Sequence, residues 1–160
     1  MPKRSAGLLL FRRSGDAEGA GSVEVMLVHM GGPFWARKDE GAWSIPKGEY
    51  GDGEEPLAVA RREFEEEIGR PPPDGPLLEL GEVRQSGGKV VTAWALEADI
   101  DVTEIESNTF EMEWPPRSGR MREFPEVDRA DWFDLDTARA KLVRAQVGLL
   151  DALRERLAHG

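Results

Sequence analysis

Apolar positions along the chain fall into short runs that read as strands and into two stretches with helical spacing. Residues 7–11 are an unbroken apolar run within a strand expected at residues 5–12, which is typical of a strand buried on both faces. Apolar-rich or alternating runs predict the other strands, at residues 23–29, 77–85, 89–100, 109–114 and around 125–133. The pattern predicts a sheet with at least one inner strand.

Helical spacing begins at Pro56. Proline suits the first position of a helix, where its missing N–H has no partner to lose, and Gly69 is a natural C-terminal stop. A second helical segment, residues 137–158, is expected to begin after a cap at Asp136 and to break near Gly148. In the first helix, the apolar residues recur at steps of three and four and form one stripe: Leu57, Ala60, Phe64 and Ile68.

Glutamates occupy a second face of the first helix, beside the apolar stripe. Glu63, Glu66 and Glu67 stand at i, i+3 and i+4, whereas Glu65 points elsewhere. Like charges at this spacing destabilise a helix by about 0.2–0.5 kcal/mol per pair, and the helix dipole disfavours anions at a C-terminal end. The cluster is therefore either a solvated acidic face or a site for Mg²⁺ or Mn²⁺, which take oxygen ligands and share their shell with substrate phosphates.

The residues around this cluster follow a spaced pattern. From Gly48 onward they fit G-x5-E-x7-R-E-U-x-E-E-x-G-U, where U is a bulky apolar residue. This resembles the signature of the Nudix hydrolase superfamily. The last position departs from it, because Arg70 stands where the family has an aliphatic packing residue. The matching residues are Gly48, Glu54, Arg62, Glu63, Phe64, Glu66, Glu67 and Gly69.

The resemblance implies a loop–helix–loop that holds one to three divalent ions. Glu54 and Arg62 would form an internal salt bridge that fixes the loop against the helix. Clustered carboxylates with Mg²⁺ suit phosphoryl chemistry, in which the ions neutralise developing charge and lower the pKa of the attacking water. The implied metal ligands are the backbone carbonyl of Gly48 and the carboxylates of Glu63, Glu66 and Glu67.

Two further positions narrow the resemblance. Residues 43–48 read W-x-x-P-K-G, which looks like the diadenosine polyphosphate hydrolases and related groups, where the lysine contacts phosphate; Lys47 is the corresponding residue here. The same group often has one more glutamate six residues before an aromatic. Glu126 stands six residues before Trp132, with Glu123 in reserve, and Glu126 is equally well read as a surface residue.

The catalytic candidates are Glu63, Glu66 and Glu126. Either Glu66 or Glu126 would position or deprotonate the attacking water, and the resemblance does not decide between them, because families differ in their choice of base.

Residues outside the signature supply less specific candidates. Phe34 and Trp35, in a loop with two cations, either stack a nucleobase or close the core. Arg117, in a later loop, is a second candidate for binding phosphate. His29 ends a predicted strand, where a lone histidine is more often structural, so it receives no role.

Composition limits the classes of function. The chain of 160 residues is long enough for one domain with a sizeable core, and we expect a single domain over residues 1–160. Its formal charge of −10 argues against general nucleic-acid binding. There is no cysteine and no apolar run long enough to cross a membrane, so we expect a cytoplasmic protein, either a monomer or a homodimer.

These observations predict a mixed α/β fold, with the signature helix on one side of a mixed sheet and the C-terminal helices on the other. The resemblance makes this the Nudix α/β/α sandwich. It implies a Mg²⁺- or Mn²⁺-dependent hydrolase of phosphoanhydride bonds in nucleoside diphosphate compounds, with diadenosine polyphosphates or similar (di)nucleoside polyphosphates as the leading substrates. The alternatives are nucleoside triphosphates, capped RNA and, from another class, a non-catalytic module that senses a nucleotide.

Overall fold

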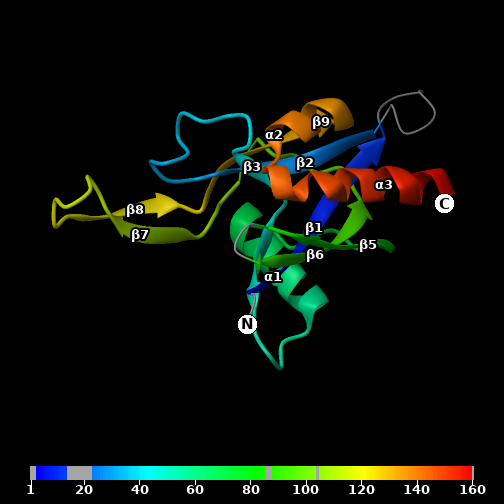
Figure 1. Ribbon diagram of the computed structural model, residues 1–160, viewed down its shortest axis with the longest axis horizontal. Coiled ribbons are helices and arrows are strands. Elements are labelled where there is room, and N and C mark those ends of the chain that lie inside the picture. The colour runs from blue at the N-terminus through cyan, green and yellow to red at the C-terminus, as the bar shows by residue number, and fades with distance from the viewer. Residues whose placement is uncertain (1–2, 14–22, 86–87, 104, 160) are drawn as a thin grey trace.

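A seven-stranded mixed sheet forms the centre of the molecule, as Figure 1 shows for the computed structural model, which describes residues 3–13, 23–85, 88–103 and 105–159. Five strands follow the order β3-β2-β1-β6-β5, while β4 pairs with β1 and β9 pairs with β2. β1 and β6 run parallel, and the other pairs are antiparallel. The strands are β1 (Arg4–Arg13), β2 (Val23–Met30), β3 (Trp43–Ser44), β4 (Lys47–Tyr50), β5 (Leu77–Arg84), β6 (Val90–Glu97) and β9 (Val127–Asp134).

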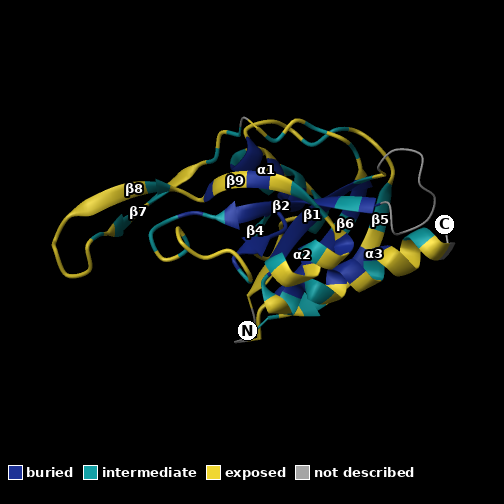
Figure 2. Ribbon diagram, turned by 90° about the horizontal axis from the view of Figure 1, so that it is seen from above, coloured by how far each residue is buried: buried dark blue, intermediate teal, exposed yellow. Residues whose placement is uncertain are grey.

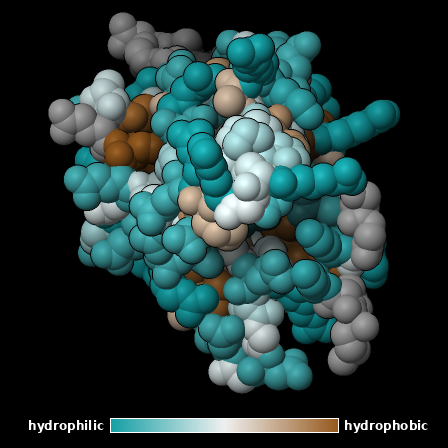
Figure 3. All heavy atoms as spheres, turned by 90° about the vertical axis from the view of Figure 1, so that its left-hand side faces the viewer, coloured by the Kyte–Doolittle hydropathy of each residue, from teal (hydrophilic) through white to brown (hydrophobic). Residues whose placement is uncertain are grey.

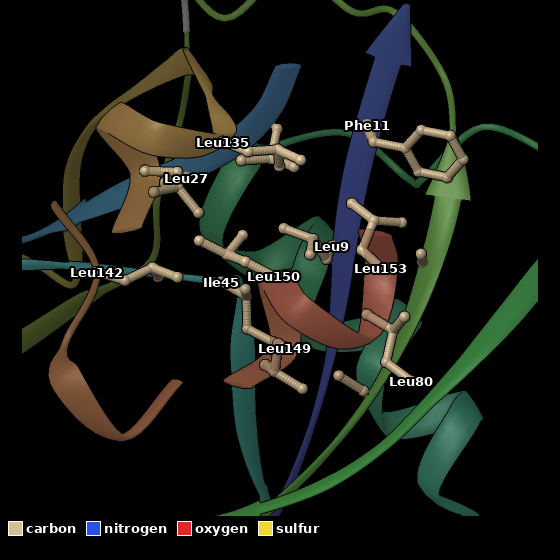
Figure 4. Close-up of a cluster of buried hydrophobic side chains, with 14 of the residues drawn as sticks. Leu9, Phe11, Leu27, Ile45, Leu80, Leu135, Leu142, Leu149, Leu150 and Leu153 are labelled. Atoms are coloured by element: carbon tan, nitrogen blue, oxygen red, sulfur yellow. The ribbon is translucent and has the colours of Figure 1, made fainter. Parts of the chain in front are cut away.

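The apolar run in β1 separates two cores, one on each face of the sheet. Leu8 and Leu10 pack with the helix α1 (Pro56–Ile68), and Leu9 and Phe11 face the C-terminal helices in the cluster shown in Figure 4. Successive side chains of a strand point to opposite faces, so an inner strand must be apolar at every position. Figure 2 shows the resulting layers, with α1 on one side of the buried strands and the other helices opposite. The predicted fold class is confirmed.

The C-terminal segment is helical but divided differently from the prediction. Asp134, rather than Asp136, caps α2 (Leu135–Lys141), because its side chain accepts a hydrogen bond from the backbone N–H of Thr137. The break comes at Leu142 and not near Gly148, and the short 3₁₀ turn η3 (Arg144–Gln146) follows it before α3 (Val147–His159). Leu142 has extended backbone angles and is buried, so its side chain stays in the core while the chain turns.

A two-stranded hairpin projects from the sheet. It consists of β7 (Thr109–Glu113) and β8 (Met121–Pro125), and it extends to the left in Figure 1. Figure 3 views the molecule from that side, where the surface is mostly hydrophilic with small separate apolar areas. β7 was predicted; β8 was not, because its sequence MREFP carries two charges and a proline. No helix among the described residues is both long and apolar enough to cross a membrane.

Candidate active site

The helix α1 carries the acidic cluster and occupies the predicted residues, 56–68. The Glu55 side chain accepts a hydrogen bond from the backbone N–H of Ala58, and Pro56 follows at the first helical position. Gly69 ends the helix with a φ of 94°, a left-handed conformation in which glycine carries no steric penalty. A β-carbon at Gly69 would also lie 2.9 Å from the Glu106 side chain. Local sequence therefore marks both ends of the helix, and the packing of Glu106 further restricts the C-terminal end to glycine.

Gly48 lies directly against Glu63, the first glutamate of the acidic cluster. β4 pairs with β1 so that Gly48 is opposite Ala6, and α1 packs across the same region. A β-carbon on Gly48 would lie 1.9 Å from Oε1 of Glu63, far inside contact distance. Only glycine lets the strand and the carboxylate approach this closely. Burial, followed by the neighbouring Glu66 carboxyl group, raises the pKa of Glu63 to about 7.

Glu67 is the most deeply buried of the signature glutamates, at 7% exposed. Its Oε2 accepts a hydrogen bond from the backbone N–H of Lys47 over 3.0 Å, which joins the helix to β4. Burial raises the pKa of Glu67 to about 8, although this hydrogen bond and the charge of Lys47 act in the opposite direction. Glu67 thus holds the loop–helix–loop together and places a second buried carboxyl group near Glu63.

Glu126 is brought to the cluster by a chain of backbone hydrogen bonds. The N–H of Asn108 donates to the carbonyl of Glu66 over 2.8 Å, and the N–H of Glu126 donates to the carbonyl of Asn108 over 2.8 Å. The carbonyl of Glu126 in turn accepts from the N–H of Gly31 over 2.9 Å. Burial of its carboxyl group, and then the Glu66 carboxylate, raises the pKa of Glu126. Glu123 lies within the projecting β8 instead, so the geometry favours Glu126 as the additional carboxylate.

The carboxylates offer the oxygen ligands that a divalent cation prefers. Among the described residues, no three acidic or imidazole side chains stand in a metal-holding arrangement. Glu67 is turned toward the N–H of Lys47. Burial first, and then repulsion from the Glu66 carboxyl group, raise the pKa of Glu63 and that of Glu126. A hard cation would relieve this repulsion, and its oxygen-ligand preference fits a set of glutamates.

A pocket of about 900 Å³ opens beside the carboxylates. Glu63 and Glu126 line it, together with Lys47 and Gly48 from β4 and Trp35 from the loop after β2. Two cations that the sequence reasoning missed also line it: Lys89, immediately before β6, and Arg144 in η3. Each is a single basic residue in an unremarkable context, so no local pattern marks them, and only the topology brings them together.

Lys47 is near both acidic and basic residues of this pocket. Burial lowers the pKa of its ammonium group, and the nearby Lys89 lowers it further, whereas Glu67, Glu49 and Glu63 favour the charged form. Two lysines close enough to repel each other at a pocket wall make a site that a bound anion would stabilise.

Two of the predicted ligand-binding residues lie elsewhere. Arg117 is in the turn between β7 and β8, at the end of the hairpin that projects from the body, and is not brought to the pocket. Phe34 is 60% exposed and packs edge-on against Trp114, with ring centroids 5.8 Å apart. Trp35 does line the pocket and also packs against the core, so it combines the two alternatives left open by the sequence.

The remaining candidates have structural contacts. Glu54 and Arg62 form an ion pair of 3.1 Å, and Glu54 also accepts a hydrogen bond from the backbone N–H of Gly51. His29 is fully buried; its Nδ1 lies 2.8 Å from Asp128 Oδ1 and its Nε2 lies 2.6 Å from the carbonyl of Lys38. These contacts tie β2 to β9 and to the loop that carries Trp35, which favours the structural reading of His29.

Solved structures with the same fold include a hydrolase of Ap4A and a domain bound to ADP ribose. A C. elegans Ap4A hydrolase in a binary complex has 23% identity and a TM-score of 0.64, with 99% of each chain covered. The NUDIX domain of Shewanella oneidensis NrtR, complexed with ADP ribose, has 18% identity and a TM-score of 0.65, covering 98% of this chain and 89% of that one. A mutT/nudix family protein from Listeria innocua has 16% identity and a TM-score of 0.62, covering 99% and 96%. At these identities the likeness is one of fold.

The family itself follows from the sequence. No curated protein matches the chain. A sequence model of the NUDIX domain, however, matches residues 1–153, nearly the whole chain. The chain therefore belongs to the NUDIX family, and the predicted enzyme class, a Nudix pyrophosphohydrolase, is confirmed.

Proposed function

We propose that the protein hydrolyses a phosphoanhydride bond in (di)nucleoside polyphosphates, with Mg²⁺ or Mn²⁺ as its cofactor. The observation that carries this proposal is the pocket in which Glu63 and Glu126 face the same space as the cations Lys47, Lys89 and Arg144. Carboxylates alone would suit a cation site, and lysines alone would suit an anion site. Their combination suits an anionic substrate that binds together with a metal.

The proposed metal ligands are the carboxylates of Glu63, Glu66 and Glu67 and the carbonyl of Gly48. The close contact between Gly48 and Glu63 supports this set, since it brings the strand backbone to the first carboxylate. When bound, the metal would neutralise charge on the phosphates and acidify the attacking water. Glu67 would need to keep its hydrogen bond to the Lys47 N–H with one oxygen and offer the other.

The protein groups divide the remaining work. Lys47 binds a phosphate oxygen of the substrate; its ammonium group is held there because the backbone of the same residue is anchored to Glu67. Glu66 or Glu126 accepts a proton from the attacking water, and the raised pKa of Glu126 makes its carboxylate a better proton acceptor than an ordinary glutamate. Trp35, on the pocket wall, offers a flat apolar surface to a nucleobase.

The cations on the wall favour a substrate with a phosphate chain. ADP-ribose, which is bound by one structural neighbour, carries hydroxyl groups beyond its second phosphate and would leave additional cations without an anionic partner. Nucleoside triphosphates remain the alternative small substrates. Capped RNA would place further phosphates against a protein whose formal charge is −10, which disfavours it.

A panel of substrates tests the proposal. The purified protein is incubated with Mg²⁺ and, separately, diadenosine tetraphosphate, a nucleoside triphosphate, ADP-ribose and a nucleotide sugar, and the products are separated by ion exchange. We expect diadenosine tetraphosphate to have the highest kcat/KM, with a nucleoside monophosphate or diphosphate among the products. Preference for ADP-ribose would overturn the substrate assignment. Tight nucleotide binding without any product would instead identify a sensing module.

A further inference from the structure

The 3₁₀ turn η3 forms one wall of the pocket. Val143, Arg144 and Ala145 all line it, and Arg144 is the cation among them. Arg144 is exposed, and within the described part of the chain no carboxylate lies within ion-pair distance of it. Its charge is thus available to a ligand in the pocket.

The backbone of this turn is held rigidly against the strand that leads to Lys47. Gln146 is fully buried: its Oε1 accepts a hydrogen bond from the N–H of Ile45 over 3.0 Å, and its Nε2 donates to Ser44 Oγ over 3.0 Å. The N–H of Val143 donates to the carbonyl of Trp43 over 2.8 Å. Because both ends of η3 are fixed to residues 43–45, the position of the Arg144 backbone relative to Lys47 is also fixed.

Arg144 therefore adds a third cation to a wall that Lys47 and Lys89 share with the carboxylates. The three basic residues come from separate parts of the chain and line the same pocket. Two adjacent phosphates bound at the carboxylates would engage the metal and Lys47. The charges of Lys89 and Arg144 would then be neutralised by a substrate with further phosphates. A planar guanidinium can bind phosphate oxygens through two parallel hydrogen bonds.

We propose that Arg144 is a specificity-determining residue, which binds the phosphates beyond the pair held at the carboxylates and so selects substrates with a longer phosphate chain. Gln146 is its positioning residue. This inference rests on the proposed function, because it assigns the far end of the same substrate.

The first test compares substrates with and without the extra phosphates. Arg144→Gln is expected to lower kcat/KM for diadenosine tetraphosphate by about 10- to 100-fold, the usual effect of losing a hydrogen bond to a charged group, and mainly through KM. The kcat/KM of Arg144→Gln for ADP-ribose stays at the wild-type level. Arg144→Lys keeps the positive charge but lacks the two parallel N–H donors of the guanidinium, so it recovers part of the lost kcat/KM. Equal losses on both substrates, or no loss on either, would overturn the proposal.

Arg154→Gln is the matched control. Arg154 is an exposed arginine on α3 that does not line the pocket, so its replacement changes the net charge equally. We expect this variant to keep the wild-type ratio between the two substrates. If it lost the preference as Arg144→Gln does, net charge rather than a placed contact would explain the effect, and the assignment would fall.

The role of Gln146 is tested with the same two substrates. Gln146→Leu removes every side-chain hydrogen bond from this residue to Ser44 and Ile45, so we expect KM for diadenosine tetraphosphate to rise while kcat for ADP-ribose is retained. A fall in kcat for both substrates would show a general structural role and remove the positioning assignment.

A binding measurement separates this inference from the proposed function. Calorimetric titration in Mg²⁺ with inorganic tripolyphosphate and with pyrophosphate needs no catalysis. We expect Arg144→Gln to weaken tripolyphosphate binding about 10-fold or more and to leave pyrophosphate binding unchanged. An inactive wild-type protein that still showed this difference would refute the hydrolase but support the Arg144 site. An active protein in which Arg144→Gln bound tripolyphosphate as tightly as the wild type would support the hydrolase and refute the Arg144 site.

Discussion

Gly48 and Glu63 touch so closely that a β-carbon on the glycine would lie 1.9 Å from Oε1 of the glutamate. The two residues belong to different elements, β4 and α1, and their contact sets how near the strand backbone comes to the acidic cluster. The glycine at the start of the signature is thus a requirement of space rather than of backbone angle.

This contact predicts a large effect of Gly48→Ala. The new methyl group must push Glu63 away or displace β4, and misplacing a catalytic group by about 1 Å can reduce the rate about 100-fold. We expect steady-state hydrolysis to fall by at least that order. Gly51→Ala is the control, because its nearest neighbour would be Glu54 Oε1 at an ordinary 3.9 Å. Comparable activity of the two variants would refute the steric argument.

The raised pKa values predict how the metal-free protein responds to pH. Glu63 and Glu67 have folded-state pKa values of about 7 and about 8, above the ordinary 4.5, so the native protein binds more protons than the unfolded chain in this interval. The free energy of unfolding should therefore decrease as the pH rises from 5 to 8, with a slope of at most about 1.4 kcal/mol per pH unit for each group. Urea unfolding at a series of pH values, in the presence of a chelator, measures this change in the free energy of unfolding.

Glu67→Gln should flatten this pH dependence, since the amide does not titrate, whereas Glu65→Gln on the exposed side of the helix should leave it unchanged. A wild-type protein that became more stable toward pH 8 without metal would contradict the assignment of buried, mutually repelling carboxyl groups.

Adding metal should restore the stability that the metal-free protein loses as the pH rises. A cation that binds only the folded state at about 100 times its Kd stabilises it by about 2.7 kcal/mol, which corresponds to about 5–10 °C in Tm for a chain of this size. We expect Mg²⁺ to raise Tm in thermal melts, and to do so more at pH 8 than at pH 5, where protons compete. Glu63→Gln should lose most of this rise. An equal rise in that variant would place the metal elsewhere.

The Glu54–Arg62 ion pair should contribute little to stability. Both side chains are about half exposed, at 41% and 49%, and exposed pairs usually contribute about 0–1 kcal/mol. A double-mutant cycle with Glu54→Gln and Arg62→Gln should give a coupling energy within that range. A coupling above about 2 kcal/mol would indicate that the pair supports a larger network than its geometry shows.

Local sequence predicted the elements whose boundaries are marked by single residues. Pro56 and Gly69 delimit α1 at the residues found, and the apolar run in β1 identified the inner strand. The C-terminal helices were harder, because Asp134 and Asp136 are both acceptable caps and the break at Leu142 is marked by neither glycine nor proline. β8 was missed because a projecting hairpin strand needs no apolar alternation.

The candidate site was predictable where its residues are close in sequence. The acidic cluster, Gly48 and Lys47 lie within one stretch, and the structure brings them together. Lys89 and Arg144 were not predictable, because their approach to Lys47 depends on the pairing of β1 with β4 and β6 and on the anchoring of η3 by Gln146. Arg117, chosen for its charge in a loop, was placed by the hairpin away from the pocket.

Hydrolysis of diadenosine tetraphosphate in ¹⁸O-labelled water tests the central claim most directly. The wild-type protein with Mg²⁺ and the variant Glu66→Gln are incubated side by side, and the products are analysed by mass spectrometry. We predict one ¹⁸O atom in one phosphate-containing product of the wild type, no product with chelator, and a loss of about 100-fold or more in the variant. Turnover that persists in both the chelated protein and the variant would contradict a metal-dependent attack of water at this carboxylate cluster.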